Sequence, residues 1–307
     1  MPKQSLRYSG WLNLIKPKGI SSANLVGKVK ALLDSSFGKN SHKVGHAGTL
    51  DPLASGVLPI AIGKATKLME YLSVDYKEYE FTVKFGQRTD TGDLEGKIVE
   101  ESPHMPLLQD LESNVASFYG KRFQVPPVFS AIKVNGQRSY DLARANKSVA
   151  LAPRLIEIRE LDLLSYEQGL ASYRTKCSSG TYIRSLAEDI AKSLGTCGVV
   201  HSLTRISSGD FAIKHAFDLF ETNYENRLAE LLKRLLPLDF ILSSMEKVVL
   251  NKEQSLKLQQ GVKISLTGWG APGLRSAYCE DLLIAVGILG LDGMFESRKV
   301  LVEQASP

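Results

Sequence analysis

Apolar and polar residues alternate in the segment YEFTVKFG, residues 79–86. In an extended chain, one face would carry the apolar residues Tyr79, Phe81, Val83 and Phe85. The other face would carry the polar residues Glu80, Thr82 and Lys84. A period of two residues is typical of a strand with one buried face. The segment therefore predicts a half-buried strand.

Helical spacing appears in SSGTYIRSLAEDIAKSLG, residues 178–195. Its apolar residues recur every three or four positions: Ile183, Leu186, Ala187, Ile190 and Leu194. Thr181 is of a type that caps helix N-termini, and Gly195 is of the type that ends helices. We expect a helix that begins after Thr181 and ends at Gly195.

Turn signals separate the other segments. VFSAIKVNGQR, residues 128–138, contains the pair Asn135-Gly136, which favours a tight hairpin turn, and SYDLARA after it has a helix-like composition. Strands followed by helices, with several hairpin signals, indicate an α+β fold whose sheet is mixed but largely antiparallel and flanked by helices.

The pattern changes near Pro237. RLLPLDF closes a helix, and residues beyond about 240 predict a short helix ending at Gly261, a strand in VKISL and a buried strand in LLIAVGI. Asp292-Gly293 forms an expected turn before RKVLV. We therefore predict two domains, residues 1–240 and a small β-rich module at residues 241–307.

Basic residues are concentrated near the start of the chain. The net charge of the 307 residues is only +5, but residues 1–50 contain eight Lys and Arg against one Asp. Such an excess favours a polyanionic partner, nucleic acid before membrane. A solvated basic face is the alternative that charge alone leaves open.

Cysteine and histidine spacing gives no metal or disulfide signal. The three cysteines are widely spaced without a C-x-x-C pair, and His42 and His46 lie among glycines rather than on a helix. The start lacks a signal-peptide core, and the longest apolar run, LLIAVGILGL, is too short to span a bilayer. We expect a soluble cytoplasmic protein without a metal site.

Common cofactor and hydrolase motifs do not fit. Between Gly56 and Gly63 lie six residues where a phosphate-binding loop has four, and Ala65 occupies the position of the magnesium-binding hydroxyl. GILGLDG has the wrong glycine spacing for a dinucleotide fingerprint, and neither G-x-S-x-G nor H-E-x-x-H occurs.

A carboxylate in an unusual loop is the main chemical candidate. In VGHAGTLDPLASG, residues 44–56, Asp51 stands among glycines and directly before Pro52, which favours an extended, displayed conformation. Tyr79 and Arg184 are the other candidates. Each has an ordinary structural alternative: Asp51 as a turn cap, Tyr79 as core, and Arg184 paired with Glu188 one helical turn on.

Six segments together resemble one enzyme family. LNLIKPKGISS, GHAGTLDPLASGVLPI with GKATK, YKEYEFTVKFGQRTDTGDLEG, PPVFSAIKVNGQRSYDLAR, SSGTYIRSLAEDI and LTRISSGDF resemble the bacterial tRNA pseudouridine synthase B (TruB) family in order and spacing, from residue 10 to about residue 240. The resemblance implies a pseudouridine synthase fold, a monomer, and isomerisation of uridine 55 in the T-loop of tRNA without cofactor or metal.

The resemblance assigns three catalytic residues. The reaction breaks the N1–C1′ bond, turns the base and joins C5 to C1′. A carboxylate is suited to it, because this group adds to a reacting carbon or stabilises positive charge. By resemblance this carboxylate is Asp51, with its attack on C6, its attack on C1′ and its removal of a sugar proton all left open. Arg184 pairs with it, and Tyr79 stacks on the uracil and helps to remove the C5 proton.

Six further residues are assigned to substrate binding. A T-loop uridine must leave its stack to react. By resemblance His46 fills the space vacated by the flipped nucleotides, Leu203 lines the uracil pocket and Tyr182 supports it. The other three are basic and contact phosphates or hold the scaffold: Lys16, Lys67 and Arg205.

The C-terminal module resembles, more weakly, the PUA RNA-binding domain that follows the catalytic domain in this family. LQQGVKI fits, whereas GMFESRKVLV lacks the usual glycine and proline before the last strand. The resemblance implies contact with the acceptor arm and CCA end of tRNA. A small β module that packs on the core is the alternative.

Two other functions remain open at this stage. One is a pseudouridine synthase acting on another RNA, as relatives in H/ACA particles do under guide RNA. The other is an RNA-folding helper that binds and remodels tRNA. In each case phosphate contacts predict binding that weakens as salt rises.

Overall fold

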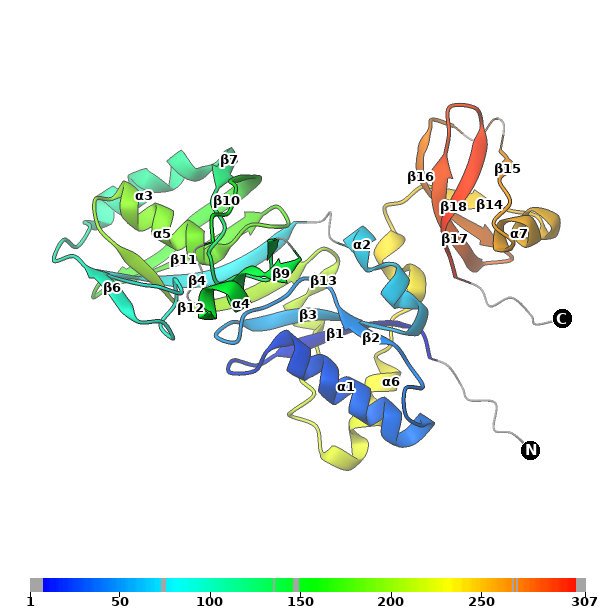
Figure 1. The fold of residues 1–307 in the computed structure, drawn as a ribbon, viewed down its shortest axis with the longest axis horizontal. Helices are drawn as coiled ribbons and strands as arrows, with labels where there is room; N and C mark the ends of the chain where they lie inside the picture. Colours follow the sequence, from blue (N-terminus) through cyan, green and yellow to red (C-terminus); the bar gives the residue numbers. More distant parts are fainter. Residues whose placement is uncertain are drawn as a thin grey trace.

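The computed structural model describes residues 8–72, 76–134, 136–145, 149–266, 268 and 270–301. These residues form two large sheets, which lie toward opposite ends of an elongated molecule (Figure 1), and two small two-stranded sheets. The larger sheet has the strand order β1-β3-β12-β4-β11-β10-β7, with β2 added to β3 and β13 added to β12. Its strands are β1 (Gly10–Lys16), β2 (Val44–His46), β3 (Ser55–Ile62), β4 (Lys77–Phe85), β7 (Gly120–Gln124), β10 (Arg154–Glu167), β11 (Leu170–Cys177), β12 (Gly198–Ser208) and β13 (Phe211–Ala212).

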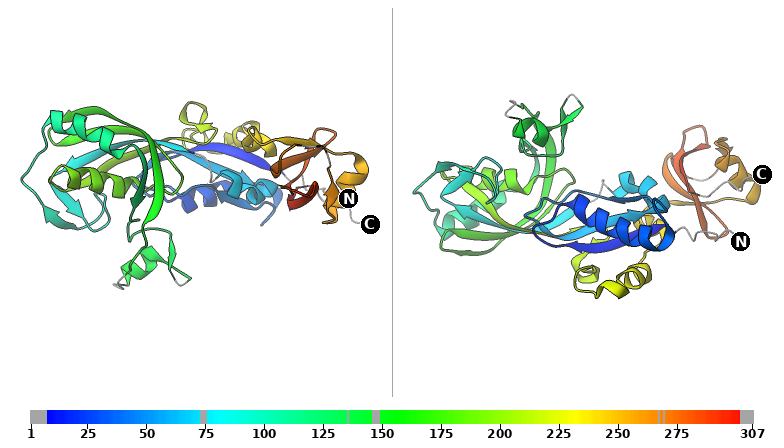
Figure 2. Two further views of the ribbon diagram at one scale, coloured as in Figure 1. Left: turned by 90° about the horizontal axis from the view of Figure 1, so that it is seen from above. Right: turned by 60° about the horizontal axis from the view of Figure 1, so that its bottom comes forward.

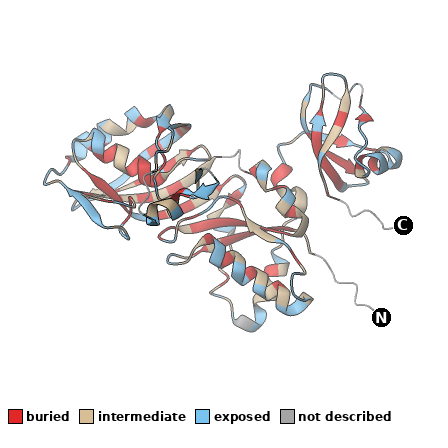
Figure 3. Cartoon of the chain, viewed as in Figure 1, coloured by how far each residue is buried: buried red, intermediate tan, exposed pale blue. Residues whose placement is uncertain are grey.

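The pairing within the larger sheet is antiparallel except where β12 runs parallel to β3. The helices pack against it: α1 (Ser22–Phe37), α2 (Met69–Leu72), α3 (Leu108–Val115), α5 (Ile183–Ser193) and α6 (Arg227–Lys233), with 3-10 turns η1 (Gly63–Lys67), η2 (Ala116–Phe118), η3 (Ile213–His215), η4 (Tyr224–Asn226) and η5 (Leu238–Leu242). Figure 3 shows the buried residues concentrated along the central strands and the inner sides of these helices. The predicted α+β class with a mixed, largely antiparallel sheet is confirmed.

Strand β4 has the faces that its alternation predicts. Tyr79, Phe81, Val83 and Phe85 are buried, and the residues between them are more exposed. Neighbouring strands β11 and β12 pair with β4 on its two edges, so β4 lies in the middle of the sheet.

Helix α5 ends as predicted but begins differently. Gly195 follows the last turn with a positive φ of 72°. The N-cap position belongs to Tyr182 and carries no side-chain hydrogen bond, because the Thr181 hydroxyl donates to the Ser178 carbonyl instead (2.9 Å). The prediction of Thr181 as N-cap is therefore wrong: a turn that precedes the helix takes its hydroxyl.

A small projection stands away from the body of the molecule, as the two further views in Figure 2 show. It consists of the paired strands β8 (Lys133–Val134) and β9 (Gln137–Arg138) followed by α4 (Ser139–Arg144). Asn135 of the predicted turn lies outside the described residues, and Gly136 has the positive φ (83°) that such turns require.

A second small hairpin pairs β5 (Gln87–Thr89) with β6 (Ile98–Glu101).

The second sheet confirms the β-rich C-terminal module. Its order is β14-β16-β17-β18-β15, made of β14 (Lys247–Val249), β15 (Ile264–Ser265), β16 (Gly273–Cys279), β17 (Leu282–Leu289) and β18 (Met294–Val300), with α7 (Lys252–Gln259) packed beside it. Gly261 follows α7 with φ 80°, where the sequence predicts the helix to end. Among the helices that the structure describes, none is long and apolar enough to cross a membrane.

Candidate active site

A cavity of about 220 Å³ brings together residues from distant parts of the larger sheet. Its walls come from the loop after β2, from β4 and β12, and from the start of α5. Five residues singled out from the sequence line it: Asp51, Tyr79, Tyr182, Arg184 and Leu203. A cavity of this size is smaller than a pocket for a drug-sized molecule and suits a single small ring.

The Asp51 loop is shaped by glycine. Gly56 has φ 102°, and a Cβ there would lie 2.3 Å from the Arg205 carbonyl oxygen, so only glycine fits. The Ser22 hydroxyl on α1 accepts from the Leu50 amide (2.8 Å) and donates to the Leu50 carbonyl (2.9 Å). These contacts fix the loop one residue before Asp51.

Asp51 and Arg184 form an ion pair. Arg184 Nη2 lies 2.8 Å from Asp51 Oδ2, and the arginine side chain is 5% exposed whereas the aspartate side chain is 35% exposed. Arg184 also donates from Nη1 to the Thr91 carbonyl (2.7 Å) and from Nη2 to the Phe129 carbonyl (2.9 Å). The guanidinium is therefore fixed behind a carboxylate that stays open to the cavity. This is the pair that the resemblance implies, in place of the alternative pair with Glu188.

Tyr79 and Leu203 form an apolar part of the wall. They come from the adjacent strands β4 and β12, and each is about 7% exposed. Burial raises the pKa of the Tyr79 hydroxyl, and the nearby Arg205 charge acts in the opposite direction. Tyr79 thus belongs to the core, as its alternation indicates, and also faces the cavity.

Tyr182 is held by a neighbouring strand. Gln124 on β7 accepts from the Tyr182 amide (2.8 Å) and donates to its carbonyl (3.1 Å). The guanidinium of Arg154 lies 5.8 Å from the centre of the tyrosine ring. The backbone at this edge of the cavity is therefore fixed from two sides.

Lys16 and Arg205 hold the scaffold. Neither has any exposed surface. The Lys16 ammonium donates to the carbonyls of Pro17 (2.9 Å) and Ile20 (2.8 Å), and burial lowers its pKa to about 8. Arg205 donates to the carbonyls of Val57 (2.7 Å) and Gly48 (2.9 Å). Of the two alternatives, burial and the carbonyl partners favour the scaffold role over the phosphate contact for both residues.

Lys67 and His46 lie outside the cavity lining. The exposed Lys67 donates to the carbonyl of Val300 in the C-terminal sheet (2.9 Å). His46, on β2, is half-buried, and its Nδ1 makes no hydrogen bond within the described residues. Burial, with the charges of Arg205 and Arg138, lowers the pKa of His46.

Polar residues of the cavity that were missed at the level of sequence include Lys77 and Ser130. Lys77 precedes Tyr79 by two positions, so the alternation that turns Tyr79 inward also turns Lys77 inward. Burial, followed by the charge of Arg205, lowers the Lys77 pKa to about 8. Ser130 carries a buried hydroxyl without a hydrogen-bond partner in the described part of the chain. For Ser130 the sequence holds no signal.

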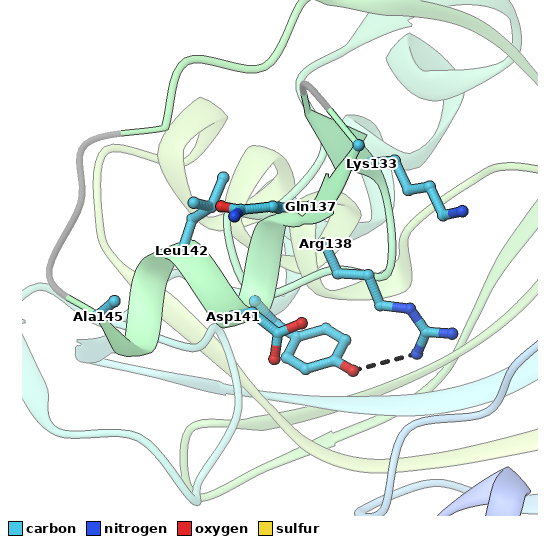
Figure 4. A pocket seen from close by; sticks show the side chains of 8 residues that line it. Lys133, Gln137, Arg138, Asp141, Leu142 and Ala145 are labelled. Atoms are coloured by element: carbon cyan, nitrogen blue, oxygen red, sulfur yellow. Dashed lines mark hydrogen bonds between the residues drawn. The ribbon is translucent and has the colours of Figure 1, made fainter.

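A second, wider hollow of about 690 Å³ lies on the projection. Figure 4 shows its lining, with Lys133, Gln137 and Arg138 from the hairpin, Asp141 and Leu142 from α4, and Ala145 directly after α4. Arg138 donates to the Tyr140 hydroxyl (3.1 Å). Across the described residues, no group of three or more His, Cys, Asp or Glu is arranged to hold a metal ion.

Comparison with known proteins gives matches over most of the chain. Residues 36–183 match the family model described as TruB family pseudouridylate synthase (N terminal domain). A tRNA pseudouridine synthase B of Rickettsia bellii (strain OSU 85-389) is 44% identical over 83% of this chain and 85% of its own length. The protein of the same name from Sinorhizobium medicae (strain WSM419) is 38% identical over 95% of both chains.

Solved structures share the fold at lower identity. An H/ACA RNP bound to a substrate RNA containing 2′-deoxyuridine aligns with a TM-score of 0.70 and 23% identity, covering 96% of this chain and 86% of the other. A Cbf5-Nop10-Gar1 complex aligns with a TM-score of 0.71 and 24% identity, covering 95% and 85%. These matches show the fold, and the relatives with 38–44% identity show that the chain belongs to the TruB family of pseudouridine synthases, which are isomerases.

Proposed function

We propose that this chain converts uridine 55 in the T-loop of tRNA to pseudouridine. The observation that carries the proposal is the Asp51 carboxylate, held by Arg184 at 2.8 Å on the wall of a cavity that Tyr79 and Leu203 also line. The relatives named tRNA pseudouridine synthase B support tRNA as the substrate.

The reaction needs a carboxylate close to the ribose. As the N1–C1′ bond breaks, C1′ becomes electron-poor, and an anion beside it either stabilises that charge or forms a transient bond. Asp51 is exposed enough to reach a substrate, while the buried Arg184 keeps its orientation. Whether Asp51 acts at C6, at C1′ or on a sugar proton is left open by this arrangement.

The size of the cavity supports base flipping in this proposal. A single ring fits, whereas a stacked loop does not, so the target uridine has to leave its stack. We propose that Tyr79 stacks on the uracil and helps to remove the C5 proton, that Leu203 lines its other side and that Tyr182 supports the wall. His46 fills the space that the flipped nucleotides vacate.

The rest of the molecule supplies RNA contacts in this proposal. Residues 1–240 form the catalytic domain, and residues 241–307 form a PUA-like domain that contacts the acceptor arm. Lys67 lies where the larger sheet meets the C-terminal sheet and contacts an RNA phosphate or holds the two together. The enzyme acts in the cytoplasm as a monomer without cofactor.

The test uses a tRNA transcript labelled with tritium at C5 of uridine. Wild-type protein is compared with Asp51→Asn and with Asp162→Asn, which removes an exposed carboxylate on β10. We expect tritium release from wild type and Asp162→Asn, no release from Asp51→Asn, and pseudouridine at position 55. Release that maps elsewhere would assign another RNA position, and equal release by Asp51→Asn would remove Asp51 from the chemistry. If wild type releases no tritium, the protein acts on tRNA only by binding.

A further inference from the structure

Lys77 is a cation in the cavity that no role above uses. It begins β4, and its side chain lies on the same face as Tyr79 and lines the same cavity. A Cβ on Gly48 would lie 3.2 Å from Lys77 Nζ. The ammonium is therefore beside the loop that carries Asp51, three residues from the carboxylate.

Among the described residues, no carboxylate pairs with the ammonium of Lys77. Within the described residues it makes neither a hydrogen bond nor an ion pair, and the Asp51 carboxylate is already held by Arg184. The groups that face Lys77 are the thiol of Cys177 on β11, opposite it in register, and the guanidinium of Arg205 on β12. The same Gly48 Cβ position lies 3.2 Å from Arg205 Nη1, which is buried and makes no hydrogen bond to any part of the chain that the structure describes.

Two cations side by side without an anion are unfavourable in the free protein. Burial of an unpaired charge costs free energy, and a ligand that brings negative charge recovers it. The cavity is thus electrostatically prepared for a group that is neutral on entry and becomes anionic, or for a group that is anionic from the start.

The reaction produces such a group. When the N1–C1′ bond breaks, its electron pair stays on N1, and the detached ring carries one negative charge shared with O2 and O4. The charge leaves the ring when C5 bonds to C1′: the C5=C6 electron pair forms this bond while the N1 pair becomes an N1=C6 double bond. The C5 proton is then removed and N1 takes up a proton, which gives the N1–H of pseudouridine. A fixed ammonium beside the ring stabilises this state more than the neutral ground state.

Resting on the proposed function, we propose that Lys77 is a further catalytic residue, whose ammonium contacts a carbonyl oxygen of the flipped uracil and stabilises the uracil anion formed on N1–C1′ cleavage. The position of Lys77 favours contact with the base over contact with a phosphate. Lys77 lies on the face of β4 that carries Tyr79 and lines the cavity, rather than on the outer face of the sheet. A phosphate contact is an outcome that the test distinguishes.

The experiment measures single-turnover pseudouridine formation in a tRNA transcript by wild type, Lys77→Met, Lys77→Gln and Lys77→Arg. Removing one charge-stabilising donor lowers such rates by about 10²-fold, and we expect that loss for the methionine and glutamine variants and a smaller one for arginine. Lys84→Met, on the opposite face of the same strand, is the matched control and is expected to react like wild type.

Two further measurements separate stabilisation of the anion from other roles. Affinity is measured in the Asp51→Asn background with and without Lys77→Met, and we expect a change of less than about threefold. A transcript with 5-fluorouridine is also tested, and its rate is measured as loss of 5-fluorouridine, because C5 carries fluorine in place of the proton that must leave to give pseudouridine. The electron-withdrawing fluorine stabilises the ring anion itself. The defect of Lys77→Met is expected to shrink on this substrate, an effect that a purely structural role does not produce.

The outcomes decide between the proposals. Wild-type rates in the uncharged variants would overturn the role of Lys77, as would a loss confined to affinity, which would indicate a phosphate contact. An equal defect on uridine and 5-fluorouridine would also overturn anion stabilisation. If wild type forms no pseudouridine, the proposed function itself fails, which the other outcomes do not imply.

Discussion

Arg184 connects segments that are distant in the sequence. Its guanidinium binds the Asp51 carboxylate and the carbonyls of Thr91 and Phe129, while its backbone lies in the first turn of α5. A flat group with several fixed donors makes such contacts at once, and a lysine does not. The position of the carboxylate therefore depends on one side chain that is itself almost fully buried.

We expect Arg184→Met to lower both stability and activity. The substitution leaves the carbonyls of Thr91 and Phe129 without this donor and Asp51 without its partner, which costs about 2–4 kcal/mol of unfolding free energy. Urea unfolding and pseudouridine formation measure the two effects. Arg88→Met is the control, because the Arg88–Glu100 pair is exposed and is worth at most about 1 kcal/mol. Equal stability of both variants would contradict a structural role for the Arg184 contacts.

The lowered pKa of Lys77 predicts a pH dependence. In the free enzyme Lys77 is protonated below its pKa of about 8 and neutral above it. Any contribution of its positive charge to the reaction is therefore made below pH 8 and lost as the pH rises above 8. Because kcat/KM reports ionisations of the free enzyme, we expect it to fall above about pH 8 in wild type. In Lys77→Arg the fall is expected to disappear, since a guanidinium stays charged. A fall that persists there would assign the titration to Lys16, whose pKa is also about 8.

The residue scale also shows what the sequence can predict. Asp51 is conspicuous because glycines and a proline surround it, and local sequence suffices to single it out. Lys16 stands in the polar stretch KPKG, which suggests exposure, yet its carbonyl partners bury it completely. Arg205 likewise binds carbonyls about 150 positions away. Such contacts exist only after folding, so local pattern does not predict them.

Helices and strands are predicted well where one hydrophobic period dominates the segment. They are predicted poorly where two local hydrogen bonds compete for the same side chain. The alternation in β4 predicts which face is buried, because a central strand has no other way to arrange its apolar residues. At the start of α5, Thr181 is a good N-cap by residue type, but the turn from Ser178 uses the same hydroxyl. The two possibilities differ by a single hydrogen bond, which residue type does not distinguish.

The projection made of β8, β9 and α4 is a candidate for RNA phosphate contacts. Lys133 and Arg138 line its hollow, and the projection stands free of the body (Figures 2 and 4). Each phosphate that a cation neutralises contributes about 0.7–0.9 to the slope of log affinity against log salt. We expect the double variant Lys133→Gln/Arg138→Gln to bind tRNA more weakly and to reduce this slope by about 1.4–1.8.

Filter binding between low and moderate salt measures that slope. Lys121→Gln removes one exposed charge on the edge strand β7 and serves as the control, with no change in slope expected. Equal slopes for wild type and the double variant would show that the projection makes no phosphate contact.

At the scale of the whole molecule, the two sheets share a buried apolar cluster. It joins Trp11 and Phe211 of the larger sheet to Tyr278, Leu283 and Val286 of the C-terminal sheet. Polar contacts cross the same boundary: the Tyr278 hydroxyl donates to Asp239 (3.0 Å), and Lys299 pairs with Glu70 (2.8 Å). The predicted boundary between residues 240 and 241 falls inside η5, whose Ile241 and Leu242 belong to this cluster.

A shared cluster predicts that the two sheets unfold together. In a Trp269→Phe background Trp11 is the sole tryptophan, so its fluorescence reports the larger sheet while circular dichroism reports both. We expect coincident denaturant transitions from the two signals. Leu283→Ala leaves a cavity in the shared cluster, which lowers the unfolding free energy by about 2–5 kcal/mol. Although the substitution changes only the C-terminal sheet, we expect it to shift both transitions equally. If the Trp11 transition stayed in place while the circular dichroism separated into two steps, the C-terminal sheet would be an independent unit that merely rests on the larger one.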